Sequence, residues 1–133
     1  MLIPKFLTFS TLIALSIAPV QSFAQENGES LFEQKCSMCH LKQRPSAEEM
    51  KNMIAPPMMG VMRHVKQAKP DRAEAIAFIA DYLEAPAQSK ALCMPQSIAR
   101  FGLMPSQKGN LTPEEAQTVA AYVYDTFGPR FNR

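Results

Sequence analysis

The chain has 133 residues, enough for one small domain. Its composition, with 47% hydrophobic and 20% charged residues, is typical of a globular protein. This composition excludes collagen, a coiled coil and full disorder as leading interpretations. The 14 basic and 12 acidic side chains give a net charge of +2 without a basic cluster, so nucleic acid is not the expected partner.

Residues 1–24 have the pattern of a secretory signal peptide. One positive charge at Lys5 precedes an apolar stretch over residues 6–20, and small residues stand three and one positions before the expected cleavage site. The alternative is an uncleaved membrane anchor, but polar residues interrupt the stretch and it is shorter than the roughly 20 residues of a membrane span. The sequence therefore predicts an exported, periplasmic protein with its domain over residues 25–133, and no membrane span once the leader is removed.

Helix signals recur along the rest of the chain, and no alternating apolar run bounded by turns predicts a strand. The expected helices cover residues 28–39, 46–53, 58–68, 71–85 and 112–127. Their starts are marked by Ser46 with Glu49, by Asp71, and by Thr112 followed by Pro113. The expected inward-facing residues are Met58, Met62, Val65, Ala75, Ile76, Ile79, Tyr82, Leu83, Ala116, Val119, Ala120, Val123 and Phe127. The fold class predicted is all-α.

Residues 86–112 are rich in Pro and Gly and predict a loop with one or two short helical turns. A loop of this length inside a compact domain is usually functional.

The motif that carries chemistry is Cys36-Ser37-Met38-Cys39-His40, the C-x-x-C-H signature of c-type haem attachment. Two thiols one helical turn apart can form thioethers to one edge of a porphyrin, while the adjacent imidazole binds the iron from below. A bare disulfide or redox pair is the alternative, as is half of a zinc site. Zinc needs further ligands at suitable spacing, and a thioredoxin-like pair needs a βαβ context, which is absent.

With His40 as the proximal ligand, the second axial ligand decides what the iron does. We favour Met104, because it precedes Pro105 in the irregular stretch, where the backbone can bend around a ring and present a thioether. The other candidates are Met94, His64, Met58, Met59 and Met62.

The order of these features resembles class I cytochromes c over essentially the whole mature chain: a first helix ending in C-x-x-C-H, a Met-Pro loop and a closing helix. The resemblance implies a small helical domain wrapped around one covalently attached haem c. It also implies that an early glycine and an aromatic on the first helix cross an aromatic on the last. Gly28, Phe32 and Tyr122 match this pattern, with Phe32 and Tyr122 packing at the haem edge, and Tyr124 is a rival to Tyr122.

In the same family a proline after the haem motif accepts a hydrogen bond from the proximal imidazole through its carbonyl. Pro56 stands at the matching spacing in Pro56-Pro57-Met58-Met59-Gly60, with Met58 in place of the usual leucine. Such a bond fixes the orientation of the imidazole and raises its basicity.

Cys93 has no partner in the mature chain once the motif cysteines hold haem. One interpretation is a buried small hydrophobe, and the other is an intermolecular disulfide or a thiol that reacts with sulfur species.

These observations predict a monomeric, periplasmic monohaem c-type cytochrome that passes single electrons between redox partner proteins and is not an enzyme. Lys35, Lys42 and Arg44 near the haem motif are interpreted either as ordinary solvated charges, the commoner explanation, or as a mild positive rim for an acidic partner. The alternatives are a haem-based sensor or small peroxidase with an opening sixth site and His64 as its distal group, and a thiol redox protein without haem.

Overall fold

The computed structural model describes residues 21–129, with side chains from residue 28 onward. Most of the expected leader lies outside this range, so its cleavage and the boundary of the mature domain stay predictions. The helices are α1 (Gln21–Lys35), α2 (Ala47–Asn52), α3 (Met58–Ala68), α4 (Arg72–Glu84), α5 (Pro95–Phe101) and α6 (Pro113–Thr126), with a 3-10 turn η1 (Gln88–Lys90). No strand occurs among the described residues, and the all-α fold class is confirmed.

The predicted capping residues begin the helices in the structure. The side chain of Asp71 caps α4 by accepting a hydrogen bond from the backbone N–H of Glu74. Ser46 opens α2 and Thr112 opens α6, each within a complete capping box that satisfies otherwise unpaired N–H groups in the first turn. Local sequence therefore sets where these helices start.

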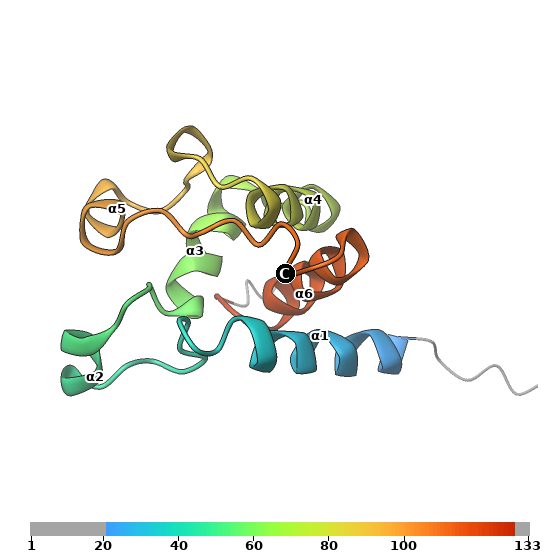
Figure 1. Ribbon diagram of the computed structural model, residues 1–133, viewed down its shortest axis with the longest axis horizontal. Helices are drawn as coiled ribbons and strands as arrows, with labels where there is room; N and C mark the ends of the chain where they lie inside the picture. The colour runs from blue at the N-terminus through green and yellow to red at the C-terminus, as the bar shows by residue number, and fades with distance from the viewer. Residues whose placement is uncertain (1–20, 130–133) are drawn as a thin grey trace, which may run out of the picture.

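Helix α6 is the centre of the fold, because it packs against both α1 and α4 and also touches α3. In Figure 1 it lies between α1 and α4, while α2 and α5 stand at the opposite end of the molecule. Helices α1 and α6 approach closely at Gly28, where an added Cβ would lie 2.6 Å from Tyr122 Cβ. Only a glycine allows this approach.

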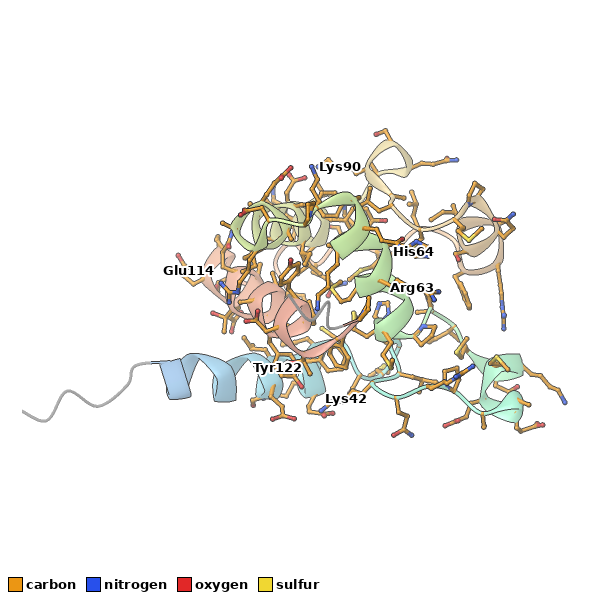
Figure 2. The ribbon with its side chains drawn as sticks, turned by 180° about the vertical axis from the view of Figure 1, so that it is seen from behind. Lys42, Arg63, His64, Lys90, Glu114 and Tyr122 are labelled. Atoms are coloured by element: carbon orange, nitrogen blue, oxygen red, sulfur yellow. The ribbon has the colours of Figure 1, made fainter. Side chains whose placement is uncertain are left out.

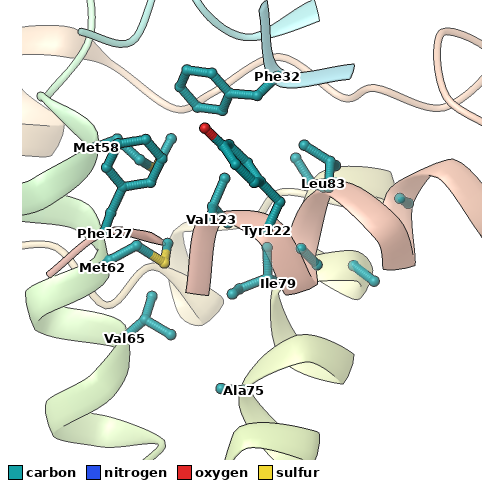
Figure 3. Close-up of a cluster of buried hydrophobic side chains, with 14 of the residues drawn as sticks. Phe32, Met58, Met62, Val65, Ala75, Ile79, Leu83, Tyr122, Val123 and Phe127 are labelled. Atoms are coloured by element: carbon teal, nitrogen blue, oxygen red, sulfur yellow. The ribbon is translucent and has the colours of Figure 1, made fainter. Parts of the chain in front are cut away.

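The buried core joins α1, α3, α4 and α6 (Figure 3). Phe32 is fully buried, and its ring centroid lies 5.9 Å from that of Tyr122 and 5.4 Å from that of Phe127. All expected inward-facing residues are buried except Ile76 and Tyr82, which are half-buried. The helical spacing thus identifies the core face of each helix.

The stretch over residues 86–112 contains η1 and α5, in agreement with the expected short helical turns. Gly102 ends α5 with φ +73°, a conformation that favours glycine, and turns the chain back towards α4. None of the helices within residues 21–129 has the length and apolar character needed to cross a membrane.

Candidate functional site

A cavity of about 210 Å³ lies between the helices, lined by side chains of α1, α3, α4, α5 and α6. Its lining is mainly apolar, as is usual for sites that hold an organic cofactor. The cavity is also lined by Cys36, Cys39, His40 and Met104, so residues that are far apart in sequence meet at one site.

The C-x-x-C-H segment continues from the end of α1 as a hydrogen-bonded turn. The helix is regular only to Lys35, four residues short of the expected end, but the backbone N–H groups of Cys36 and His40 still bond to the carbonyls of Phe32 and Cys36, both at 2.9 Å. The turn brings both thiols to the cavity wall, with Cys36 half-buried and Cys39 exposed. Burial raises the pKa of Cys36 to about 11, and the neighbouring Cys39 adds to the effect.

His40 is held in one orientation by the carbonyl of Pro56. Its Nδ1 lies 2.8 Å from that oxygen, and because a carbonyl only accepts, Nδ1 carries the hydrogen and donates it. The remaining nitrogen, Nε2, is then an unprotonated lone pair, the form that binds a metal. Burial lowers the pKa of His40 and favours this neutral form, although the bond to Pro56 acts in the opposite direction.

The structure separates the candidates for a second axial ligand into two groups. Met104, Met58 and Met62 line the cavity, whereas Met94, Met59 and His64 do not. Met94 and Met59 are 54% and 46% exposed, and His64 lies on α3 outside the cavity lining (Figure 2).

Met104 lies in a short segment that is fixed at both ends. On one side Gly102 has φ +73°, and on the other the backbone N–H of Gln107 bonds to Leu83 O at 2.8 Å, with the hydroxyl of Ser106 bonded to Glu84 O. These bonds attach the Met104 segment to the end of α4.

The aromatic pair expected at the helix crossing is present, but it does not line the cavity. Phe32 and Tyr122 pack beside Gly28, and neither is among the residues that line the cavity. Tyr124 is not at the crossing, because its hydroxyl donates to Pro70 O at 3.1 Å and its ring packs under Lys66. From α6 it is Val119 and Val123 that line the cavity.

Cys93 is half-buried and lines the cavity. This position was not part of either interpretation of Cys93, the buried small hydrophobe or the reactive thiol. Burial raises the pKa of its thiol and so keeps it protonated.

Of the three basic residues near the haem motif, Lys42 is paired with carboxylates, whereas Lys35 and Arg44 are exposed and keep their charges. Lys42 Nζ lies 3.0 Å from a carboxylate oxygen of Glu29 and 2.6 Å from one of Glu33, and these two carboxylates raise the pKa of Lys42. Figure 2 shows Lys42 beside α1, near Tyr122, whose hydroxyl bonds to Glu29 at 3.4 Å. Lys35 donates to Asn110 at 3.3 Å, and Arg44 is exposed.

Sequence reasoning missed the opposite wall of the cavity, which α4 and α5 provide. Its residues that were not expected to face inward are Phe78, Ser97, Ile98 and Phe101. Only the irregular composition of residues 86–112 pointed to this region, because spacing within one helix carries no information on which other helix it faces.

Within residues 28–129, no group of three or more His, Cys, Asp and Glu side chains is arranged to hold a free metal ion.

A small helical domain with a C-x-x-C-H turn at the wall of an apolar cavity defines a c-type cytochrome domain. The chain belongs to the cytochrome c family described as cytochrome C oxidase, cbb3-type, subunit III, whose family model matches residues 23–123. An uncharacterized protein of Aquifex aeolicus (strain VF5) is 30% identical over 133 residues, covering 91% of this chain and 87% of the relative. No solved structure matches the chain. Membership of this family implies haem c binding and haem-based electron transfer.

Proposed function

We propose that the chain is an exported electron carrier with one covalently attached haem, ligated by His40 and Met104. The observation that carries the proposal is the cavity, which has Cys36, Cys39 and His40 on its wall together with Met104. When bound, the haem supplies an iron that alternates between the ferrous and ferric states.

The residues of the C-x-x-C-H turn fit this group. Cys36 and Cys39 are one helical turn apart on the cavity wall, which suits two thioether bonds to neighbouring positions on one edge of a ring. The Nε2 atom of His40 is the one free to bind a metal, because Nδ1 donates its hydrogen to Pro56 O. The carbonyl fixes the plane of the imidazole and raises its basicity as a ligand.

Met104 is favoured over Met58 and Met62 by its position relative to His40. Met58 follows Pro56 by two residues, and its backbone N–H bonds to Leu41 O at 3.0 Å, next to His40. The start of α3 is therefore attached to the His40 side of the cavity. The Met104 segment is attached instead to the end of α4, so His40 and Met104 would hold the haem from two separately anchored parts of the cavity wall. Thioether ligation favours the ferrous state and raises the potential.

The two alternative functions find less support. A sensor or peroxidase needs a distal acid or base, and His64, the second of the two histidines, does not line the cavity. A thiol redox protein needs a reactive thiolate, whereas the pKa of Cys36 is raised to about 11. Export to the periplasm is supported by the leader pattern over residues 1–24.

The first test is the pigment of the purified protein. A pyridine haemochrome assay is expected to find one c-type haem per chain, and the oxidised protein is expected to show a weak methionine-to-iron charge-transfer band. Colourless protein, or pigment that washes out in acidified acetone, contradicts the proposal. Rapid carbon monoxide binding by the reduced wild type favours the sensor instead.

The second test assigns the axial ligand. Met104→Ala is expected to abolish the charge-transfer band, and Met94→Ala, the matched control in the other Met-Pro dipeptide, is expected to keep it. Survival of the band in Met104→Ala, or its loss in Met94→Ala, shows that the ligand assignment is wrong.

A further inference from the structure

A network of side-chain hydrogen bonds joins the end of α1 to the segment that carries Met104. Lys35 Nζ donates to Asn110 Oδ1 at 3.3 Å, and Asn110 Nδ2 donates to Gln107 Oε1 at 2.8 Å. Gln107 Nε2 donates in turn to the carbonyl oxygen of Pro105 at 2.9 Å. Since Pro105 directly follows Met104, three hydrogen bonds connect the candidate ligand segment to a distant helix.

The two ends of this network fix its direction. A lysine ammonium has only donors, so the amide of Asn110 has to turn its oxygen to Lys35 and its NH₂ group to Gln107. The carbonyl of Pro105 only accepts, so Gln107 has to turn its NH₂ group to Pro105 and its oxygen to Asn110. Both ends therefore require the same orientation of the two amides, and the positive charge of Lys35 strengthens the first bond.

Gln107 is the centre of the network. Its backbone N–H bonds to Leu83 O at 2.8 Å, which attaches the segment to α4. Its backbone oxygen accepts from the N–H groups of Asn110 and Leu111, at 2.9 and 3.0 Å, and so closes the turn before α6. Its side chain is half-buried and lines the cavity. This one residue thus connects the Met104 segment to α4 through its backbone and to α1 through its side chain.

We infer that three side chains act as positioning residues for the Met104 ligand: Lys35, Asn110 and Gln107. Their hydrogen bonds hold the carbonyl of Pro105, and with it the neighbouring thioether, in the position required for binding the iron. The inference rests on the proposed function, in which Met104 is an axial ligand. The requirement is greatest in the ferric state, because thioether ligation favours the ferrous state.

Exogenous imidazole measures how firmly Met104 is held. Imidazole can bind the ferric protein only where Met104 has left the iron, so its apparent affinity rises with the fraction of the protein in that state. Both ligands are neutral, so a variant that changes the charge of the protein alters this exchange little. The titration is followed by the loss of the methionine-to-iron charge-transfer band.

Gln107→Glu breaks the bond next to the ligand. It replaces the donor that faces Pro105 O by a carboxylate oxygen, and it keeps an acceptor for Asn110. Two acceptors then face each other, so the apparent affinity for imidazole is expected to rise about tenfold. The matched control is Gln34→Glu on α1, where the amide donates to Ser30 Oγ at 2.8 Å and the residue does not line the cavity. This control is expected to stay within about twofold of wild type.

Asn110→Ala breaks the network further from the ligand and leaves Gln107 in place. The apparent affinity for imidazole is expected to rise about threefold. Because Asn110 is exposed, this variant keeps the test available if Gln107→Glu does not fold. Lys35→Met removes the charged end, and the double variant Lys35→Met/Asn110→Ala is expected to match Asn110→Ala alone, since Lys35 acts only through Asn110.

A variant that is destabilised elsewhere separates positioning from a general loss of stability. Arg72→Gln removes the ion pair with Asp125 between α4 and α6, and neither residue lines the cavity. Its affinity for imidazole is expected to equal that of wild type. Unchanged affinity in both Gln107→Glu and Asn110→Ala, a rise in Gln34→Glu or Arg72→Gln as large as theirs, or independent effects of Lys35→Met and Asn110→Ala would overturn the inference. Protein without haem, or a charge-transfer band that survives Met104→Ala, would instead refute the proposed function.

Discussion

An alanine at position 28 tests the close crossing of α1 and α6. The new Cβ would lie 2.6 Å from Tyr122 Cβ and 3.1 Å from Thr118 O. Carbon atoms pack best at about 3.5–4.0 Å, so the two helices have to move apart by about 1 Å. Tyr122 cannot turn away, because it is 4% exposed and packed against Phe32.

The magnitude follows from two opposing effects. Alanine is a better helix former than glycine by about 0.8–1.0 kcal/mol. Overpacking a core costs about 1–3 kcal/mol, and the upper part of this range applies because the contact involves the first side-chain atom and a backbone oxygen rather than a flexible end. Gly28→Ala is therefore expected to lower the free energy of unfolding by about 1–2 kcal/mol.

The matched control is Gly60→Ala on α3, where the nearest atom to an added Cβ is Pro57 Cγ at 3.9 Å. This variant meets no clash and is expected to gain up to about 1 kcal/mol. Urea denaturation of both variants and wild type, followed by far-UV circular dichroism, gives the comparison. If Gly28→Ala proves as stable as Gly60→Ala, the close approach of α1 and α6 described above is incorrect.

Two further predictions concern single groups. Iodoacetamide is expected to label one thiol, Cys93, in the denatured protein. In the native protein the same thiol is expected to react slowly, because burial raises its pKa. Mass spectra that show fast labelling of the native protein would contradict the partial burial of Cys93. The carboxyl of Glu49 accepts a hydrogen bond from the Ser46 N–H, which lowers its pKa from the ordinary 4.5. Its contribution to α2 is thus complete above about pH 4.5 and is lost as the pH falls through the lowered pKa. The loss of this stabilisation with falling pH is followed by the NMR shifts of the α2 amides in wild type and in Glu49→Gln. If the α2 amide shifts of the variant change with pH as those of wild type do, the capping role of Glu49 is wrong.

Local chemistry explains why much of the fold was predictable. Asp71 and Thr112 mark helix starts because the first N–H groups of any helix need acceptors, wherever that helix packs. The haem motif was predictable for a similar reason, since its spacing follows from one helical turn. These signals are complete within a few residues of sequence.

Long-range placement was predictable only where the family resemblance supplied it, as for Gly28 with Tyr122 and for His40 with Pro56. Glu29 and Glu33 lie one turn apart on α1. Nothing in the sequence indicated that the ammonium group of Lys42 would form ion pairs with both carboxylates. The position of Phe32 and Tyr122 at the haem edge stays a prediction, and the residues of α6 that line the cavity are Val119 and Val123, both of which were expected to face inward. Such outcomes depend on how helices pack against one another, and a single sequence does not specify that.

Helix α2 contains no buried residue and stands away from the core in Figure 1. A side chain reaches it from α5, where Arg100 donates to the backbone oxygen of Met50, a bond that does not depend on which side chain occupies position 50. A thiol linker at position 50 would therefore tether the protein to an electrode without disturbing its interior. Helix α2 is therefore a suitable place to immobilise the protein by an introduced thiol, because Met50 is exposed and the helix buries no side chain.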